Sequence, residues 1–517
     1  MRLATVALAR ALARALALAL GPTAVATAQA NPEVAAIQLP KALEIRDVLA
    51  VDVDADGRTD LVLVCADPAA HRRELRVHLA AAGTPAFGAE PSLPPYQVER
   101  DVIAFAYADV DAHPGRELVL FTADRAVAVV PGDANGKHYE PLFSHALVWR
   151  APDDEDVLAL ADVVQDVDRD GRDDFVLPEP DGARVLLQRR GERGTTWAPP
   201  AIWSQPERRT PLSPAGGGPA RLGRGELQLR FDLGDRDDDG FDRRPLVQMR
   251  SRAALTELVD LDGDGVLDGV ALRNQTLWWW HNGSGGQLAT AATALALPMP
   301  ADRLMLFDPA FDVQLALLDG DRRPDLLLTT SARRNDEIEV RVDRFHQRDL
   351  ADPWPDKPES RLRLQTLARP PQLVDADGDG RLDLVAITVR TDLLRGLTGG
   401  APTSLEAQLN IYRNDGARFV TPGVLIQQLQ LPAPRGRKQR TFVRVLPGLQ
   451  GAAGALLLRS EDRVQLRPLQ RDGERLRLDP PAWQVPVGDE AMPRLLPGAT
   501  DALLVLDRHE LLHVRWR

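Results

Sequence analysis

The chain is poor in the residues that several familiar architectures require. Its single cysteine, Cys65, excludes an intramolecular disulfide framework and any zinc or iron–sulfur site built on cysteines. Aromatic residues make up 5% of the 517 residues, and no apolar run of 18 residues lacks a charge, which argues against a membrane-spanning body. Lys and Arg number 63 against 75 Asp and Glu, the opposite of the balance that phosphate binding favours. We therefore expect no nucleic-acid partner, and we expect Cys65 to be a buried, small apolar residue.

The first thirty residues have the pattern of an export signal. They contain three arginines and no acid, an apolar stretch from Ala15 to Leu20, and a small-x-small sequence at Ala28-Gln29-Ala30. We expect residues 1–30 to be removed by cleavage after Ala30, and the mature chain to be secreted or periplasmic. Without disulfides, its stability must come from packing and from bound metal.

An acidic loop between two short apolar runs recurs along the rest of the chain. In its full form it has Asp at positions 1, 3, 5 and 9 and Gly at position 6, and it begins at Asp52, Asp166, Asp260 and Asp375. Weaker copies begin at positions 109, 235 and 317, where His113, Arg243 and Leu317 each replace an expected ligand. Two further frames without the acids lie near Val445 and Leu495.

The spacing of these loops predicts a ring of repeated units. First positions at 52, 109, 166, 260, 317 and 375 are separated by 57, 57, 94, 57 and 58 residues. A period of this size is typical of β-propellers, and the long step places an insertion within residues 206–250. The flanking runs, such as Leu61–Val64, are short and rich in Val and Leu, which favours strands buried on both faces.

We therefore expect an all-β fold: one β-propeller over residues 31–517 with about seven to eight four-stranded blades. Eight frames can be counted. The last frame lacks a fourth strand, and residues 34–39 precede the first frame. We expect this N-terminal strand to pair with the final blade and close the ring, which removes exposed sheet edges.

Four carboxylates around one sharp turn suit a calcium ion, because calcium prefers several hard oxygen ligands. An EF-hand is excluded, because position 12 holds Leu63, Leu177, Ala271 or Ala386 instead of a bidentate glutamate. The expected carboxylate ligands are Asp52, Asp54, Asp56, Asp60, Asp166, Asp168, Asp170, Asp174, Asp260, Asp262, Asp264, Asp268, Asp375, Asp377, Asp379 and Asp383. The backbone carbonyls expected at position 7 are those of Arg58, Arg172, Val266 and Arg381. The nine histidines are scattered, with no pair at metal-binding spacing.

The acidic loop, its apolar flanks and the spacing resemble the FG-GAP/VCBS repeats of integrin-α-type β-propellers. The resemblance covers nearly all of residues 33–517. It implies calcium on the four intact loops and a role in binding or adhesion, whereas members of this type usually have seven blades.

Two classes of function remain open at this point. The first is a non-enzymatic module, monomeric and outside the cell, that binds a protein or glycan ligand or serves as a scaffold. The second is an extracellular carbohydrate-active enzyme, a lyase or hydrolase, built on a propeller. Trp278-Trp279-Trp280 could be a sugar-stacking platform, but packing between blades is the favoured reading.

Overall fold

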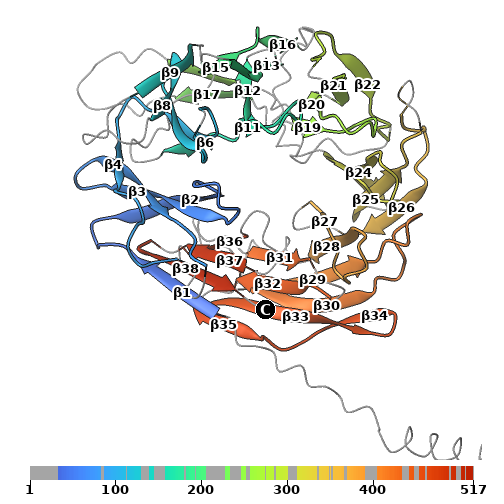
Figure 1. The fold of residues 1–517 in the computed structure, drawn as a ribbon. Coiled ribbons are helices and arrows are strands. Elements are labelled where there is room, and N and C mark those ends of the chain that lie inside the picture. Colours follow the sequence, from blue (N-terminus) through green and yellow to red (C-terminus); the bar gives the residue numbers. More distant parts are fainter. Residues whose placement is uncertain are drawn as a thin grey trace, which may run out of the picture.

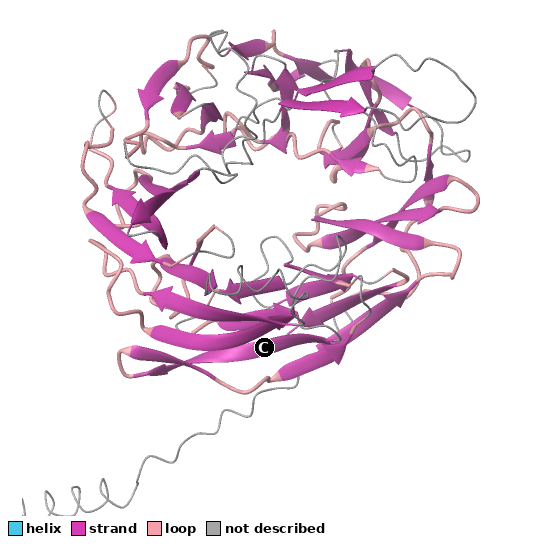
Figure 2. Ribbon diagram, turned by 180° about the vertical axis from the view of Figure 1, so that it is seen from behind, coloured by secondary structure: helices cyan, strands magenta, loops and turns pink. Residues whose placement is uncertain are grey.

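The structure of the chain is a computed structural model. It describes residues 33–515 apart from 83–86, 112, 130–138, 145–157, 180–181, 192–193, 205–226, 233–245, 252–256, 274, 284–286, 301–310, 335–336, 349, 351–352, 366–369, 390–403, 433–441, 448–452, 460–462, 488–490, 496–501 and 507. The described residues form strands and loops (Figure 2), and none of them belongs to a helix long and apolar enough to cross a membrane.

Eight sheets stand as blades around a ring, so the all-β propeller prediction is confirmed and the blade number is eight (Figure 1). The first blade contains β2 (Glu44–Val51), β3 (Asp60–Asp67), β4 (Arg72–His78) and β5 (Tyr96–Val98). The second contains β6 (Ala104–Ala108), β7 (Glu117–Phe121), β8 (Arg125–Val129) and β9 (Tyr139–Ser144), with β10 (Ala159–Leu160) parallel to β6. The third contains β11 (Val164–Gln165), β12 (Asp174–Glu179), β13 (Gly182–Leu186) and β16 (Ala201–Ser204). The fourth contains β19 (Glu257–Val259), β20 (Asp268–Arg273), β21 (Thr276–Trp280) and β22 (Thr293–Ala296).

The second half of the ring follows the same plan. The fifth blade contains β23 (Phe311–Ala316), β24 (Asp325–Arg334), β25 (Glu337–Phe345) and β26 (Ser360–Leu364). The sixth contains β27 (Gln372–Val374), β28 (Asp383–Val389), β29 (Ser404–Tyr412) and β30 (Leu425–Pro432). The seventh contains β31 (Phe442–Leu446), β32 (Ala455–Arg459), β33 (Arg463–Asp472) and β35 (Trp483–Pro486), with β34 (Arg475–Leu478) paired to the end of β33. The eighth contains β36 (Met492–Leu495), β37 (Ala502–Leu506), β38 (Glu510–Arg515) and β1 (Glu33–Gln38).

The two ends of the described chain meet in the eighth blade. Strand β1 pairs antiparallel with β38, from Glu33 opposite Arg515 to Gln38 opposite Glu510. Ile37 of β1 is 1% exposed and packs with residues of the first and eighth blades. The predicted closure by an N-terminal strand is therefore confirmed.

The core lies between neighbouring blades. Among the described residues, buried apolar side chains form eight clusters, and each cluster joins one blade to the next around the ring. Strand β3 illustrates this arrangement, because all eight of its residues are buried. Its side chains alternate between the two faces of the blade, so each face packs against a different neighbouring blade. Cys65 on this strand is 0% exposed, as expected.

The tryptophan run packs between blades in the same way. The rings of Trp280 and Trp203 stack at 5.8 Å between the fourth and third blades, while Trp279 on the opposite face joins the cluster shared with the fifth blade. Gly269 makes room for this stack, because a Cβ there would lie 2.6 Å from the Trp203 ring.

The predicted insertion lies between the third and fourth blades. Within residues 206–250 most positions lie outside the described residues, including the weak acidic copy that begins at Asp235. The described part contains β17 (Leu227–Asp232), which pairs with β18 (Leu246–Ser251) as a separate two-stranded sheet. A second small hairpin, β14 (Gln188–Gly191) with β15 (Gly194–Trp197), belongs to the third blade's outer connection.

Candidate metal centres

All of the described acidic loops lie on one face of the ring. Each connects the first strand of a blade to the second, and every blade runs from its inner strand outwards in the same antiparallel order. We call this side the loop face. It carries residues 52–60, 109–111, 113–117, 166–174, 260–268, 317–325 and 375–383.

Each intact loop folds around the aspartate at position 1. In the loop at 166, the carboxylate of Asp166 accepts hydrogen bonds from the backbone N–H groups of Asp170 (3.0 Å) and Gly171 (2.9 Å). The loops at 52, 260 and 375 make the same bond from the glycine at position 6. That glycine has a positive φ in all four loops, a conformation that glycine adopts without strain; it is 82° at Gly171.

The residue at position 4 also takes a left-handed conformation, which the sequence analysis did not foresee. Its φ is 59° at Ala55, 56° at Arg169 and 73° at Gly378. The loops beginning at 260, 317 and 375 have glycine at this position, and this glycine could have predicted the left-handed conformation. Two left-handed residues two positions apart wind the loop tightly enough to turn its carboxylates inward.

Three of the four predicted carboxylates come together in each of the loops beginning at 52, 166 and 260. In the loop at 52, oxygen atoms of Asp52, Asp54 and Asp60 lie within 4.8 Å of one another. The same holds for Asp166, Asp168 and Asp174, and for Asp260, Asp262 and Asp264. The loop at 375 repeats the backbone hydrogen bonds of the others, to Asp375, Asp377, Asp379 and Asp383.

The aspartate at position 9 is a structural residue as well as a candidate ligand. It begins the second strand of the blade and is buried. Asp174 accepts the backbone N–H of Val167 at 2.9 Å and that of Gln188 at 2.7 Å. Asp60, Asp268 and Asp383 accept equivalent pairs of bonds, the second always from two residues beyond the third strand. Position 9 therefore fastens the acidic loop to the hairpin beside it.

The residue two positions beyond the third strand often carries an amide that reaches the preceding blade. Gln188 Nε2 donates to the Asp109 carbonyl at 2.7 Å, and Gln347 Nε2 to the Leu261 carbonyl at 2.8 Å. Asn414 Nδ2 donates to the Leu318 carbonyl at 2.6 Å. Each acceptor lies in an acidic loop, so neighbouring loops are linked around the face.

Burial makes ionisation of the position-9 carboxylates costly. It raises the pKa of Asp174 and of Asp268 to about 6 and that of Asp383 to about 7, against the lowering effect of their backbone hydrogen bonds. Neighbouring aspartates raise these pKa values further. A cation bound between the carboxylates would offset both effects.

Basic side chains already lie beside several of the groups. Arg189 Nη1 is 2.7 Å from Asp168 and 3.5 Å from Asp170. In the sixth blade, Arg471 of the seventh reaches Asp377 at 3.2 Å. A metal ion at these two loops must share the carboxylates with, or displace, an arginine.

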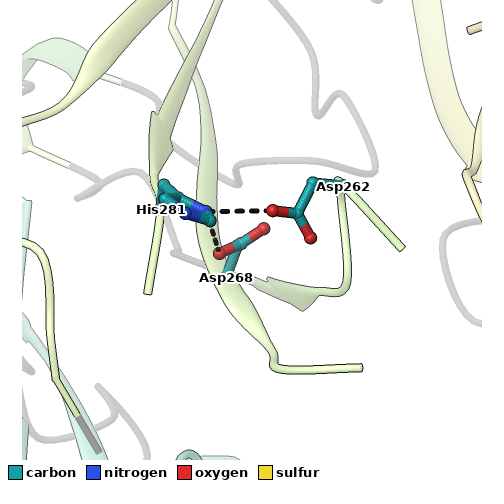
Figure 3. A group of neighbouring side chains, drawn as sticks. All are labelled: Asp262, Asp268 and His281. Carbon is teal, nitrogen blue, oxygen red and sulfur yellow. Dashed lines mark ion pairs between the residues drawn. The ribbon is translucent and has the colours of Figure 1, made fainter. Parts of the chain in front are cut away.

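Two histidines enter acidic groups that the sequence analysis assigned to aspartates alone. Figure 3 shows the His281 ring facing the carboxylates of Asp262 and Asp268. Its Nδ1 lies 3.2 Å from Asp262 and 3.5 Å from Asp268. His346 Nδ1 lies 2.7 Å from Asp319 and 3.1 Å from Asp325 in the weak copy at 317. Both histidines directly follow the third strand of their blade. Their separation from the loops in sequence hid this arrangement.

The weak copy at 109 is arranged differently. Glu117 replaces aspartate at position 9 and accepts the Val110 N–H at 3.0 Å, while Asp111 pairs with His113 at 2.9 Å. Its position 1, Asp109, donates its backbone N–H to Asp173 of the next loop.

A cavity of about 310 Å³ lies between the third and fourth blades. It is lined by Asp162, Gln165 and Glu257 together with apolar side chains that include Val163, Pro178 and Leu258. Strands β11 and β19, which supply part of its lining, lie nearer the centre of the ring than β16 and β22 (Figure 1).

No protein-family model matches the chain, and no curated protein matches it in sequence. Among solved structures, a lectin of Agrocybe aegerita described as recognising non-reducing terminal N-acetylglucosamine is similar over 90% of this chain and 92% of its own, with 13% identity and a TM-score of 0.39. BBS1N, solved in complex with ARL6DN, is similar over 93% and 97%, with 10% identity and a TM-score of 0.30. The Photorhabdus luminescens Tc holotoxin pore is similar over 94% of this chain and 28% of its own, with 14% identity and a TM-score of 0.29. Similarity this weak says nothing about what the chain binds.

Proposed function

We propose that this chain is an exported, calcium-binding β-propeller of the FG-GAP/VCBS type that binds a protein or glycan ligand outside the cell. Metal binding is supported above all by a buried carboxylate oxygen of Asp168 that lacks a hydrogen-bond donor. Its side chain is 5% exposed, and its Oδ1 atom has no hydrogen-bond partner. A buried carboxylate oxygen without a donor is destabilising, and a cation held with Asp166 and Asp174 would satisfy it.

The donor set fits calcium. Each intact loop offers carboxylate oxygens at positions 1, 3, 5 and 9, and the carbonyl at position 7 is the predicted backbone ligand. The three carboxylates that converge in each of the loops at 52 and 166 are hard oxygen ligands without nitrogen or sulfur. When bound, calcium neutralises the mutual repulsion of these carboxylates. The chain's own residues then hold each loop against the neighbouring hairpin through position 9.

Thermal unfolding in chelator and in millimolar calcium tests this half of the proposal. Calcium binds the folded loops and should raise the melting temperature. Asp168→Asn, which keeps the size of the side chain, should reduce the increase, whereas Asp124→Asn in the turn between β7 and β8 should not. An unchanged melting temperature in calcium would remove the metal role.

The binding half of the proposal centres on the cavity between the third and fourth blades. Its carboxylates and the Gln165 amide can accept and donate hydrogen bonds, and its apolar wall can contact a sugar ring or a peptide side chain. The insertion leaves the ring between the same two blades. A glycan array and a peptide library, screened with the wild type and with Gln165→Ala, test this site. Equal binding by the two proteins would place the ligand elsewhere.

Two carboxylates in one cavity also support the second candidate, a carbohydrate-active enzyme. Asp162 and Glu257 line the cavity, and glycoside hydrolysis commonly uses two such groups. If the wild type cleaves a polysaccharide and neither Asp162→Asn nor Glu257→Gln does so, the chain is a carbohydrate-active enzyme and not a binding module.

Export is tested separately, by mass analysis of the N-terminus in the cell-envelope and medium fractions, where the expected first residue is Asn31.

A further inference from the structure

We infer that the acidic loops of the fourth and fifth blades bind a transition-metal dication such as Zn²⁺ or Co²⁺, through one histidine and two aspartates each. The inference rests on the proposed function in that it uses the same loop face for metal binding. It differs in the metal and in the added histidine. At the loop beginning at Asp260 the transition metal takes the place of calcium, because both ions would use Asp262 and Asp268. One group is Asp262, Asp268 and His281; the other is Asp319, Asp321 and His346.

The two histidines occupy equivalent places in adjacent blades. His281 follows β21 and His346 follows β25, and each faces positions 3 and 9 of its own acidic loop. In the first, third and sixth blades the residue at this place is Leu79, Leu187 or Arg413. The imidazole is therefore a property of two loops and not of the repeat.

The distances suit ligands of one small ion. In each group all ligand atoms lie within 4.8 Å of one another. Two ligands bound at about 2.1 Å are separated by about 3.0 Å in octahedral and about 3.4 Å in tetrahedral coordination. The Nδ1 atom of His281 is 3.2 Å from the Asp262 carboxylate, which lies in this range, and 3.5 Å from the Asp268 carboxylate, which lies just above it.

The surroundings hold the groups in place. The His281 ring lies 5.1 Å from the Trp279 ring, centroid to centroid, and the Asn282 N–H binds Asp268 at 2.8 Å. In the fifth blade Arg344, which is 1% exposed, binds Asp325 at 2.7 and 3.1 Å. Asp325 is thereby paired with a cation, and Asp319 and Asp321 are left as the carboxylates of that group.

The ligand chemistry separates these loops from the others. Calcium takes oxygen ligands, whereas imidazole nitrogen suits zinc, cobalt and nickel. The fifth blade also lacks the first calcium ligand, because position 1 is Leu317. The loop that is the poorer calcium site is thus a complete three-ligand set for a transition metal.

Cobalt titration of the full-length mature chain tests the inference. The chain is stripped with chelator, saturated with calcium, and titrated with Co²⁺, whose visible absorption reports nitrogen and oxygen ligation. We expect two Co²⁺ per chain to bind in the presence of calcium, one of them by displacing the calcium ion at the loop beginning at Asp260. His281→Gln and His346→Gln should each lower the Co²⁺ affinity of one site by at least about tenfold.

His113→Gln is the matched control, because His113 lies in an acidic loop, is 84% exposed on its side chain and faces a single carboxylate. It should retain both Co²⁺ ions. If the histidine variants bind Co²⁺ as the wild type does, or if the wild type binds none, the histidines are ion-pair partners of the aspartates and the inference is wrong. Calcium stabilisation is measured on the same samples: its loss alone would remove the proposed function and leave this inference standing.

Discussion

Replacing Asn414 by alanine should weaken the contact between the fifth and sixth blades. The Asn414 side chain is 0% exposed; its Nδ2 donates to the Leu318 carbonyl at 2.6 Å, and its Oδ1 accepts the Gly416 N–H at 3.0 Å. Alanine keeps the backbone bond to Asp383 but removes these two bonds and a third, in which Arg344 Nη1 donates to the Asn414 Oδ1 at 3.3 Å. Arg344 retains its bonds to Asp325.

The size of the effect follows from the burial of the two backbone groups that lose a partner, the Leu318 carbonyl and the Gly416 N–H. Leu318 is 1% exposed, so its unpaired carbonyl should cost about 1–3 kcal/mol. Gly416 is partly exposed and its N–H can reach water, which limits that loss to about 1 kcal/mol. The expected decrease in the free energy of unfolding is about 2–4 kcal/mol.

Urea unfolding at fixed calcium concentration measures this decrease. Gln427→Ala is the control, because its amide is exposed and donates to the Gln428 carbonyl on the same strand; it should cost less than about 0.5 kcal/mol. If the two variants are equally stable, the amide bridges between neighbouring loops do not hold the blades together.

Three further outcomes follow from burial in the core and loops. Gly269→Ala should destabilise the fold by about 1–3 kcal/mol, since its Cβ would meet the Trp203 ring; Gly88→Ala, with no neighbour closer than 3.5 Å, should not, and equal melting temperatures would refute the steric argument. Burial raises the pKa of the Cys65 thiol to about 12, so a thiol reagent should modify it in urea and leave the native chain unlabelled. Burial also raises the pKa of Asp383 to about 7, above the unfolded value of about 4, so without calcium the fold should lose stability as pH rises through this interval. Thermal melts in chelator across that interval check the sign, and a rising melting temperature would contradict it.

The ring could be predicted from the sequence because the acidic loop and its apolar flanks recur at a nearly constant spacing. The spacing of 57 residues and the apolar runs beside each loop fix blade size and strand type. The absence of a fourth strand after Leu511 identified the strand that β1 supplies. Blade number remained between seven and eight because eight frames can be counted, whereas propellers of the type that the chain resembles usually have seven blades.

The chemistry of the loops could be predicted only in part. Asp52, Asp54 and Asp60 were found because they are close in sequence as well as in space. His281 and His346 were missed, because an antiparallel blade brings the end of its third strand beside the loop between its first two strands. The bridging amides of Gln188 and Asn414 were missed for the same reason: their partners are 79 and 96 residues away.

The central claim is that the acidic loops bind calcium and thereby stabilise the ring. Isothermal titration of the chelator-treated mature chain with calcium tests it most directly, with bound metal counted by elemental analysis after dialysis. The account predicts calcium bound at the intact loops beginning at Asp52, Asp166, Asp260 and Asp375, with a parallel rise in melting temperature. A chain that takes up no calcium at millimolar concentration, and melts at the same temperature with and without it, would contradict the account.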